Sequence, residues 1–282
     1  MPLKIISIGS SSSGNSYLIT SGRTNLLLDV GLTGRVIKSA LAGFGLCAKD
    51  INGLFVTHEH IDHIRSLRMM ARECADAQIV TSRGTRNACP AFEFIAPDRL
   101  KLVQSQSELV IGDIYARAFS LSHDAAEPVG FSFSSGGESL TVVTDTGVVT
   151  DEIFYEIAGA DKLVLEANHE VSVLEVGPYP YMLKRRILSD VGHLSNEAAG
   201  NALARAVDLR VDKVKAGQDP IHVMLAHLST TNNTPDNARL TVKDVLREHG
   251  FAAGNDYLLN IAAKSDITPM DAPVYGADDV VE

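Results

Sequence analysis

Four candidate metal ligands lie close together in one short segment of the sequence. The segment Thr57-His58-Glu59-His60-Ile61-Asp62-His63 offers three imidazoles and one carboxylate as ligands. Residues two apart in an extended chain project to the same side, so His58 and His60 can reach one point. Asp62 and His63 lie where the chain turns into a helix and can aim at a point nearby. Such nitrogen and oxygen ligands suit Zn²⁺, Mn²⁺ or Fe and leave the choice among them open.

A short buried strand and a helix are expected to position this segment. Gly53 to Thr57 leads directly into it, and a helix is expected from about His63 to Arg72. Further strands are expected at residues 4–8, 17–20, 25–30, 79–81, 162–165, 222–226 and 257–261, with a β-rich stretch over 109–144. Ser135-Gly136-Gly137 fits a hairpin turn within that stretch. Further helices are expected from about residue 34 and at 151–157, 196–207 and 235–249. The sequence therefore predicts one α/β domain over residues 1–265, followed by an acidic, flexible tail over residues 266–282.

The segment His58-x-His60-x-Asp62-His63, entered from Leu54-Phe55-Val56, resembles the signature of the metallo-β-lactamase superfamily. That resemblance implies a four-layer αββα sandwich with a binuclear metal site at one edge. It also implies three further ligands in a fixed order along the chain. His123, Asp145 and His227 match these ligands, and each follows a run that is typical of a strand.

The resemblance also implies how the ligands divide between two divalent ions. His58, His60 and His123 would hold one ion, Asp62, His63 and His227 the other, and Asp145 would bridge the two. Taken alone, His123 or His227 would more often be a surface or core histidine. Asp29 matches an acid of the family's first motif that orients a ligand histidine. Its alternative is an ordinary turn at the end of a strand.

Five longer stretches narrow the resemblance to the small, single-domain WalJ/YycJ-type branch of the superfamily. They are residues 9–16, 124–130, 177–186, 192–197 and 227–235, and the similarity runs over most of residues 3 to 262. That branch is nuclease-like and is related to ribonuclease Z and the phosphodiesterases. Only 81 residues separate Asp145 from His227, so the large second domain of the β-CASP nucleases is absent. The long arm with which ribonuclease Z holds tRNA is not evident either. A processive RNA-end or tRNA-specific role is therefore disfavoured.

Glu166 and His193 resemble the pair that assists leaving-group protonation in ribonuclease Z. A carboxylate beside an imidazole could hold that ring for general acid work. The alternative is a purely structural role: Glu166 would simply end a strand, and His193 would simply precede Ser195, the N-cap of the next helix. For His169, a functional role and a purely structural role both stay open.

Two more stretches have both a functional and a plain interpretation. The Ser/Gly-rich residues 9–16 could present N–H groups and hydroxyls to a phosphate, or form an ordinary turn. Lys184-Arg185-Arg186 is the densest basic run, and Tyr179 and Tyr181 lie just before it. The run could border a groove in which the tyrosines stack on bases, or it could be a solvated helix face.

The overall charge limits the class of partner. The net charge of -10 argues against nonspecific coating of nucleic acid, but metal ions can supply positive charge at a nuclease site. The three cysteines are too few and too irregularly spaced for a disulfide framework. No signal peptide or membrane-spanning run is evident, so we expect a cytoplasmic protein without a membrane partner. Its oligomeric state is open.

The combined expectation is a binuclear metal-dependent hydrolase, a phosphodiesterase or exonuclease-like enzyme acting on DNA or RNA. A water between two Zn²⁺ or Mn²⁺ ions, with Fe as a further option, would be activated as hydroxide. Asp62 would orient it, and His193, held by Glu166, would donate a proton to the leaving group. The first alternative is a small-molecule hydrolase, either a cyclic phosphodiesterase or a thioesterase. A non-catalytic regulatory module is disfavoured because all seven ligands are present.

Overall fold

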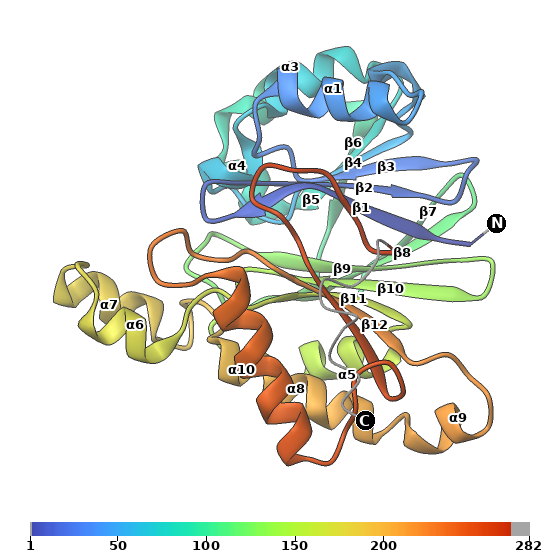
Figure 1. Cartoon of the computed structure of the whole chain (residues 1–282). Coiled ribbons are helices and arrows are strands. Elements are labelled where there is room, and N and C mark those ends of the chain that lie inside the picture. Colours follow the sequence, from blue (N-terminus) through green and yellow to red (C-terminus); the bar gives the residue numbers. More distant parts are fainter. Residues whose placement is uncertain (1, 272–282) are drawn as a thin grey trace.

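Two seven-stranded mixed sheets lie face to face in the computed structural model, which describes residues 2–271 (Figure 1). The first sheet has the order β14 (Thr268–Pro269), β1 (Lys4–Ser11), β2 (Gly14–Thr20), β3 (Asn25–Leu28), β4 (Gly53–Phe55), β5 (Gln78–Ser82), β6 (Leu100–Val103). The second has the order β13 (Tyr257–Ile261), β12 (Ile221–Ala226), β11 (Lys162–Glu166), β10 (Glu138–Val143), β9 (Val129–Ser135), β8 (Ile114–Ser120), β7 (Glu108–Ile111).

Helices cover the outer faces of both sheets and complete the four layers (Figure 1). The first sheet carries α1 (Gly34–Gly43), α2 (Ile61–Ile64), α3 (Leu67–Glu73) and α4 (Arg83–Ala88), with short 3-10 turns at residues 48–50, 90–94 and 97–99. The second carries α5 (Asp151–Gly159), α8 (Asn196–Asp208), α9 (Val211–Lys215) and α10 (Pro235–Glu248). Two further helices, α6 (Val171–Val176) and α7 (Tyr181–Ile187), extend away from this body. The predicted αββα sandwich is confirmed.

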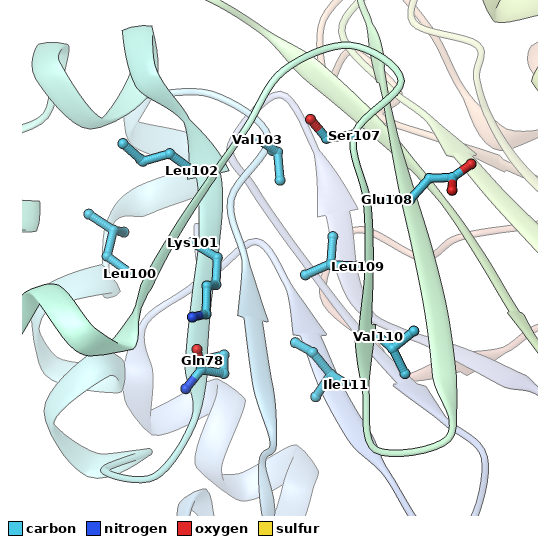
Figure 2. Close-up of a pocket in the computed structure, with 10 residues that line it drawn as sticks. All are labelled: Gln78, Leu100, Lys101, Leu102, Val103, Ser107, Glu108, Leu109, Val110 and Ile111. Atoms are coloured by element: carbon cyan, nitrogen blue, oxygen red, sulfur yellow. The ribbon is translucent and has the colours of Figure 1, made fainter.

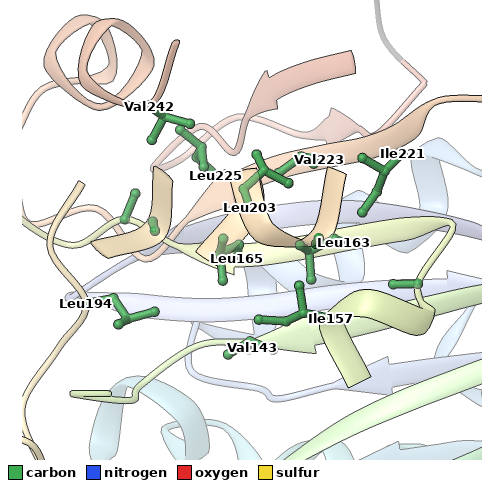
Figure 3. Packing of buried hydrophobic residues seen from close by; sticks show 14 of the residues in the cluster. Val143, Ile157, Leu163, Leu165, Leu194, Leu203, Ile221, Val223, Leu225 and Val242 are labelled. Carbon is green, nitrogen blue, oxygen red and sulfur yellow. The ribbon is translucent and has the colours of Figure 1, made fainter. Parts of the chain in front are cut away.

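Three apolar layers hold the sandwich together. One lies between the two sheets, one between the first sheet and its helices, and one between the second sheet and α5, α8 and α10. Figure 3 shows the last layer, where Leu163 and Leu165 of β11 pack with Ile157 of α5 and Leu203 of α8. Each such fully buried aliphatic side chain contributes roughly 1.5–3 kcal/mol. The strands beneath the site are therefore rigid supports.

Parallel strands point their carboxyl ends at one edge of the sandwich. β3, β4, β5 and β6 run parallel in the first sheet, and β10, β11, β12 and β13 run parallel in the second. Polar residues follow the ends of β3, β4, β10 and β12, at Asp29, His58, Asp145 and His227. This is the edge at which ligands bind in open α/β sheets.

The structure differs from the sequence-based expectations in three places. The helix expected over residues 63–72 is two helices, α2 and α3, because the Ser66 amide donates to Val30 and its hydroxyl donates to Leu32. Helices α4, α6 and α9 were not predicted, whereas α7 contains the basic run for which a helix face was one of two interpretations. The expected tail does not begin at residue 266, since β14 pairs with β1 and Met270 is buried. Residues 272–282 of that tail lie outside the described residues.

Candidate metal centre

Three residues of the site adopt a left-handed backbone conformation. Asp29 has φ +57°, Asp145 has φ +62° and His227 has φ +56°. Non-glycine residues seldom adopt this conformation, and it costs about 1–3 kcal/mol unless the surroundings enforce it. Asp29 directly follows β3 and His227 directly follows β12, whereas Asp145 lies two residues beyond the end of β10. The turn at each strand end therefore aims a polar side chain into the edge of the sandwich.

The first group of candidate ligands is His58, His60 and His123. One nitrogen of each ring lies within 4.8 Å of those of the other two. His60 Nδ1 and His123 Nε2 are 3.2 Å apart, and His58 Nε2 is buried with no hydrogen-bond partner. A buried polar atom without a partner is costly. A divalent ion between these nitrogens would satisfy it.

Asp62, His63 and His227 form the second group. Asp62 Oδ2 lies 3.5 Å from His63 Nε2 and 3.4 Å from His227 Nε2. Both histidine side chains are buried, whereas the Asp62 side chain is 18% exposed. This carboxylate therefore borders the open side of the centre.

Asp145 lies between the two groups. Its Oδ2 is 3.1 Å from His63 Nε2, and its Oδ1 is 3.4 Å from His227 Nε2 and 3.7 Å from His123 Nε2. Oδ2 is buried and accepts no hydrogen bond. One carboxylate thus touches ligand nitrogens of both groups, as a residue that bridges two ions must. The donor set and the unpartnered buried atoms fit two divalent ions.

Hydrogen bonds to the far nitrogens orient three of the rings. His63 Nδ1 donates to Asp29 Oδ2 at 2.8 Å. His227 Nδ1 donates to Glu166 Oε1 at 2.9 Å, and His123 Nδ1 donates to the Gly192 carbonyl at 3.1 Å. Each bond fixes the tautomer and leaves Nε2 free to bind a metal ion. Asp29 thus lies where the resemblance implied an orienting acid.

We expect Asp29→Asn to weaken binding of the ion at Asp62, His63 and His227 by about 10–100-fold. The reason is that His63 Nδ1 loses its charged hydrogen-bond acceptor. Asparagine tolerates the left-handed backbone at this position, so the turn is kept. The ion held by His58, His60 and His123 should bind as before. Stepwise chelator titration of the variant and the wild type would measure both affinities. Equal weakening of both ions would show that Asp29 supports the whole turn rather than one ring.

Charges within the site divide its histidines into two kinds. Burial would lower the pKa of His63, but Asp145 and Asp29 outweigh it and raise that pKa well above its usual value. Burial is likewise outweighed at His227, whose pKa rises to about 10 beside Asp145, Asp62 and Glu166. Burial does lower the pKa values of His58 and His123. Without metal, His63 and His227 are therefore protonated near neutral pH, whereas His58 and His123 are neutral and ready to bind.

Metal uptake should consequently release about two protons, one each from His63 and His227. Because a raised pKa keeps the proton bound up to higher pH, affinity at this group should fall as the pH is lowered from about 10. Affinity at the group that contains His58 and His123, whose pKa values are lowered, should change much less over that range. Calorimetric titration in buffers of different ionisation enthalpy would count the protons. Identical pH dependence of both binding steps would contradict the expectation.

Glu166 joins His193 to the centre. It is fully buried, and its Oε1 accepts from His193 Nδ1 at 2.8 Å as well as from His227. Burial would raise its pKa, but the two histidines lower it to about 2, so the group is a carboxylate. The His193 side chain is 17% exposed. Its Nε2 is the ring nitrogen that Glu166 does not hold, and Nδ1 lies 3.8 Å from Asp145 Oδ1.

The serine-rich hairpin of β1 and β2 is part of the site, in a way that the sequence did not show. The Asn15 amide nitrogen lies 3.2 Å from His63 Nε2. Ser10 Oγ accepts from the His227 backbone N–H at 2.9 Å and contacts Asn15. A Cβ on Gly31 would lie 1.5 Å from the Asp62 carbonyl, so glycine is required where the hairpin and ligand segment meet. Asn15 had no signal beyond its place in the resembling stretch.

Two other candidates are not among the candidate ligands. His169 is buried, neither ring nitrogen has a hydrogen-bond partner, and burial lowers its pKa to about 4. It belongs to none of the ligand groups in the described residues. The basic run lies on α7, where Arg186 pairs with Asp124 beside His123. A mainly aliphatic recess between β6 and β7 (Figure 2) contains none of the site residues.

The fold and the ligand set together define a metallo-β-lactamase-type protein. Residues 24–213 match the family model described as a beta-lactamase superfamily domain, and the chain belongs to the metallo-β-lactamase superfamily. It is 38% identical to exodeoxyribonuclease YycJ of Bacillus anthracis, over 91% of this chain and 94% of that protein. It is 33% identical to exodeoxyribonuclease WalJ of Streptococcus pneumoniae, over 93% of this chain and 95% of that protein. The predicted WalJ/YycJ-type branch is confirmed.

Solved structures share the fold at much lower sequence identity. The metallo-β-lactamase fold protein YhfI from Bacillus subtilis has a TM-score of 0.69 and 19% identity, with 95% of this chain and 100% of that chain covered. Unliganded yeast PDE1 has a TM-score of 0.66 and 14% identity, with 95% and 99% covered. Within residues 2–271, no helix combines the length and the apolar character that a membrane crossing requires.

Proposed function

We propose that this chain is a two-metal phosphodiesterase that cleaves DNA as an exodeoxyribonuclease. The main support for two ions is the position of Asp145, whose two carboxylate oxygens lie near ring nitrogens of both candidate ligand groups. Two ions held this way suit in-line displacement at phosphorus. The names of the two close relatives support DNA as the substrate.

We assign the seven ligands as two triads with a bridge. The first triad is His58, His60 and His123; the second is Asp62, His63 and His227; Asp145 is the bridge. The nitrogen-rich set suits Zn²⁺ or Mn²⁺, with Fe as a further option. When bound, the ions would supply positive charge at the scissile phosphate and lower the pKa of a water to near neutrality.

The remaining chemistry belongs to the chain's own side chains. The Asp62 carboxylate is ionised, since His227 and His63 outweigh the effect of burial and lower its pKa. It borders the open side and can accept a hydrogen bond from an attacking water. His193, with Nδ1 bound to Glu166, can donate a proton from Nε2 to the leaving oxygen. A cytoplasmic location fits such a substrate.

Cleavage assays with single-stranded DNA, duplex DNA and RNA in Mn²⁺ or Zn²⁺ would test this proposal. Bis-p-nitrophenyl phosphate and a thioester belong in the same panel, with Asp145→Asn as the control. We expect DNA cleavage that is absent in the control. Turnover of only the small phosphodiester or the thioester would favour the alternative, a small-molecule hydrolase, which a net charge of -10 suits.

A further inference from the structure

A pair of short helices extends from the sandwich close to the site. Figure 1 shows α6 and α7 (yellow) reaching away from both sheets and from α8 and α10. Several apolar side chains here are largely exposed: Val176 is 87% exposed, Tyr181 71% and Met182 72%. We call residues 171–191 the projection. Such exposure of large apolar side chains within one small element is typical of a binding surface.

The base of the projection is attached directly to the candidate centre. The His193 amide donates to the Ile187 carbonyl at 3.0 Å, and the Gly192 carbonyl accepts from the ligand His123. A Cβ on Gly192 would lie 2.2 Å from the Ile187 carbonyl oxygen, so only glycine fits this turn. A molecule bound on the projection would therefore lie at a fixed place relative to the metal ions.

An ion pair makes a second attachment. Arg186 of α7 forms two hydrogen bonds to the Asp124 carboxylate, and Asp124 directly follows the ligand His123. The bond to Asp124 raises the pKa of Arg186. This residue of the basic run is thus neutralised and serves to hold α7 against the site.

The other two basic residues keep their charge available. Lys184 Nζ donates to the uncharged Glu175 carbonyl at 2.8 Å, and Arg185 is exposed, with its guanidinium 5.9 Å from the centre of the Tyr181 ring. Lys184 and Arg185 thus place two cations beside an exposed aromatic ring, in a chain of net charge -10. Proteins hold single-stranded nucleic acid with this combination, cations for the phosphates and rings for the bases.

We propose that the projection holds a single-stranded polynucleotide that leads into the metal centre. Arg185 and Lys184 contact its phosphates, and Tyr181 stacks on a base. The substrate is single-stranded here because paired bases offer no free face to an aromatic ring. The proposal rests on the proposed function, since it requires a polynucleotide substrate. A second copy of this chain is the competing occupant of the exposed apolar surface.

The test compares two double variants of the whole chain. Tyr181→Ala/Arg185→Ala removes an exposed ring and an exposed cation from the projection. Tyr155→Ala/Lys213→Ala removes the same two groups from α5 and α9, and serves as the matched control. The substrates are an oligothymidylate of roughly 16 nucleotides, the upper site size of a single OB-fold that binds single strands, and bis-p-nitrophenyl phosphate.

We expect the projection variant to raise KM for the oligothymidylate by about tenfold or more and to leave kcat and turnover of bis-p-nitrophenyl phosphate unchanged. The affinity of this variant for the oligothymidylate should also fall less steeply as the salt concentration is raised. An unchanged KM overturns the proposal. So does a change in molar mass by light scattering with an unchanged KM, which would make this surface a contact between copies.

The binding measurement separates this proposal from the proposed function. Fluorescence anisotropy of labelled oligothymidylate is measured with each double variant and with the unsubstituted chain. Binding that is lost only in the projection variant supports the projection even if the chain cleaves no DNA. If DNA is cleaved but neither KM nor anisotropy responds to the projection variant, the proposed function holds and the projection proposal fails.

Discussion

Asp145→Asn should lower phosphodiester turnover by on the order of a thousandfold or more, because the paired ions supply several kcal/mol of charge stabilisation. Asp145 is buried, and its oxygens lie 3.1 to 3.7 Å from nitrogens of three ligand histidines. Asparagine keeps the shape but loses the charge. It also tolerates φ +62°, where alanine would add backbone strain.

Metal content is the measurement that gives this result its meaning. Elemental analysis of purified Asp145→Asn should find weaker retention of both ions, because the oxygens of this carboxylate lie near ring nitrogens of both triads. Asp151→Asn replaces an exposed acid on α5 and is the matched control, which should keep metal and activity. Full turnover in Asp145→Asn would exclude a bridging role for this carboxylate.

The candidate ligands could be proposed from the sequence because they match the order of the superfamily's motifs and follow strand-like runs. His58, Asp145 and His227 follow apolar runs short enough to be strands, and parallel strands bring their carboxyl ends to one edge. The spacing within residues 58–63 and the resemblance to the superfamily together point to these candidates, and the fold brings them to one edge. The left-handed turns at Asp145 and His227 could not be predicted, since neither residue type requires that conformation.

Contacts that depend on packing could not be read from the sequence. Serine and asparagine favour turns for local reasons, so nothing marked Asn15 as a neighbour of His63. The Asp124–Arg186 ion pair joins residues 62 positions apart. Only the folded chain brings such partners together.

Short helices were missed for a related reason. α6 has six residues and α7 has seven, which is too short for a helical period to be clear. Helices of this length are not stable alone and depend on contacts with the rest of the chain. A helix face was one interpretation of the basic run of α7, but its place beside the candidate metal centre depends on contacts that the sequence does not show.

The second large effect is expected at His193. Replacement with alanine should lower kcat by roughly 10²–10⁴-fold, the usual contribution of a general acid. Both ions should remain bound, because none of the seven assigned ligands is removed. His222→Ala, at the far end of β12, is the matched control.

Glu166→Gln tests the two proposed roles of this carboxylate, which are to orient His193 and to orient His227. Glu166 accepts from His193 and from the ligand His227, at 2.8 and 2.9 Å. Loss of its charge should therefore weaken metal binding by about 10–100-fold and lower kcat as well, whereas His193→Ala should lower kcat alone.

A leaving group of low pKa, such as p-nitrophenolate, needs no proton and should restore much of the rate of His193→Ala. If His193→Ala instead loses a metal ion, His193 is a ligand, in keeping with its closeness to Asp145 and His227, and another group must protonate the leaving oxygen.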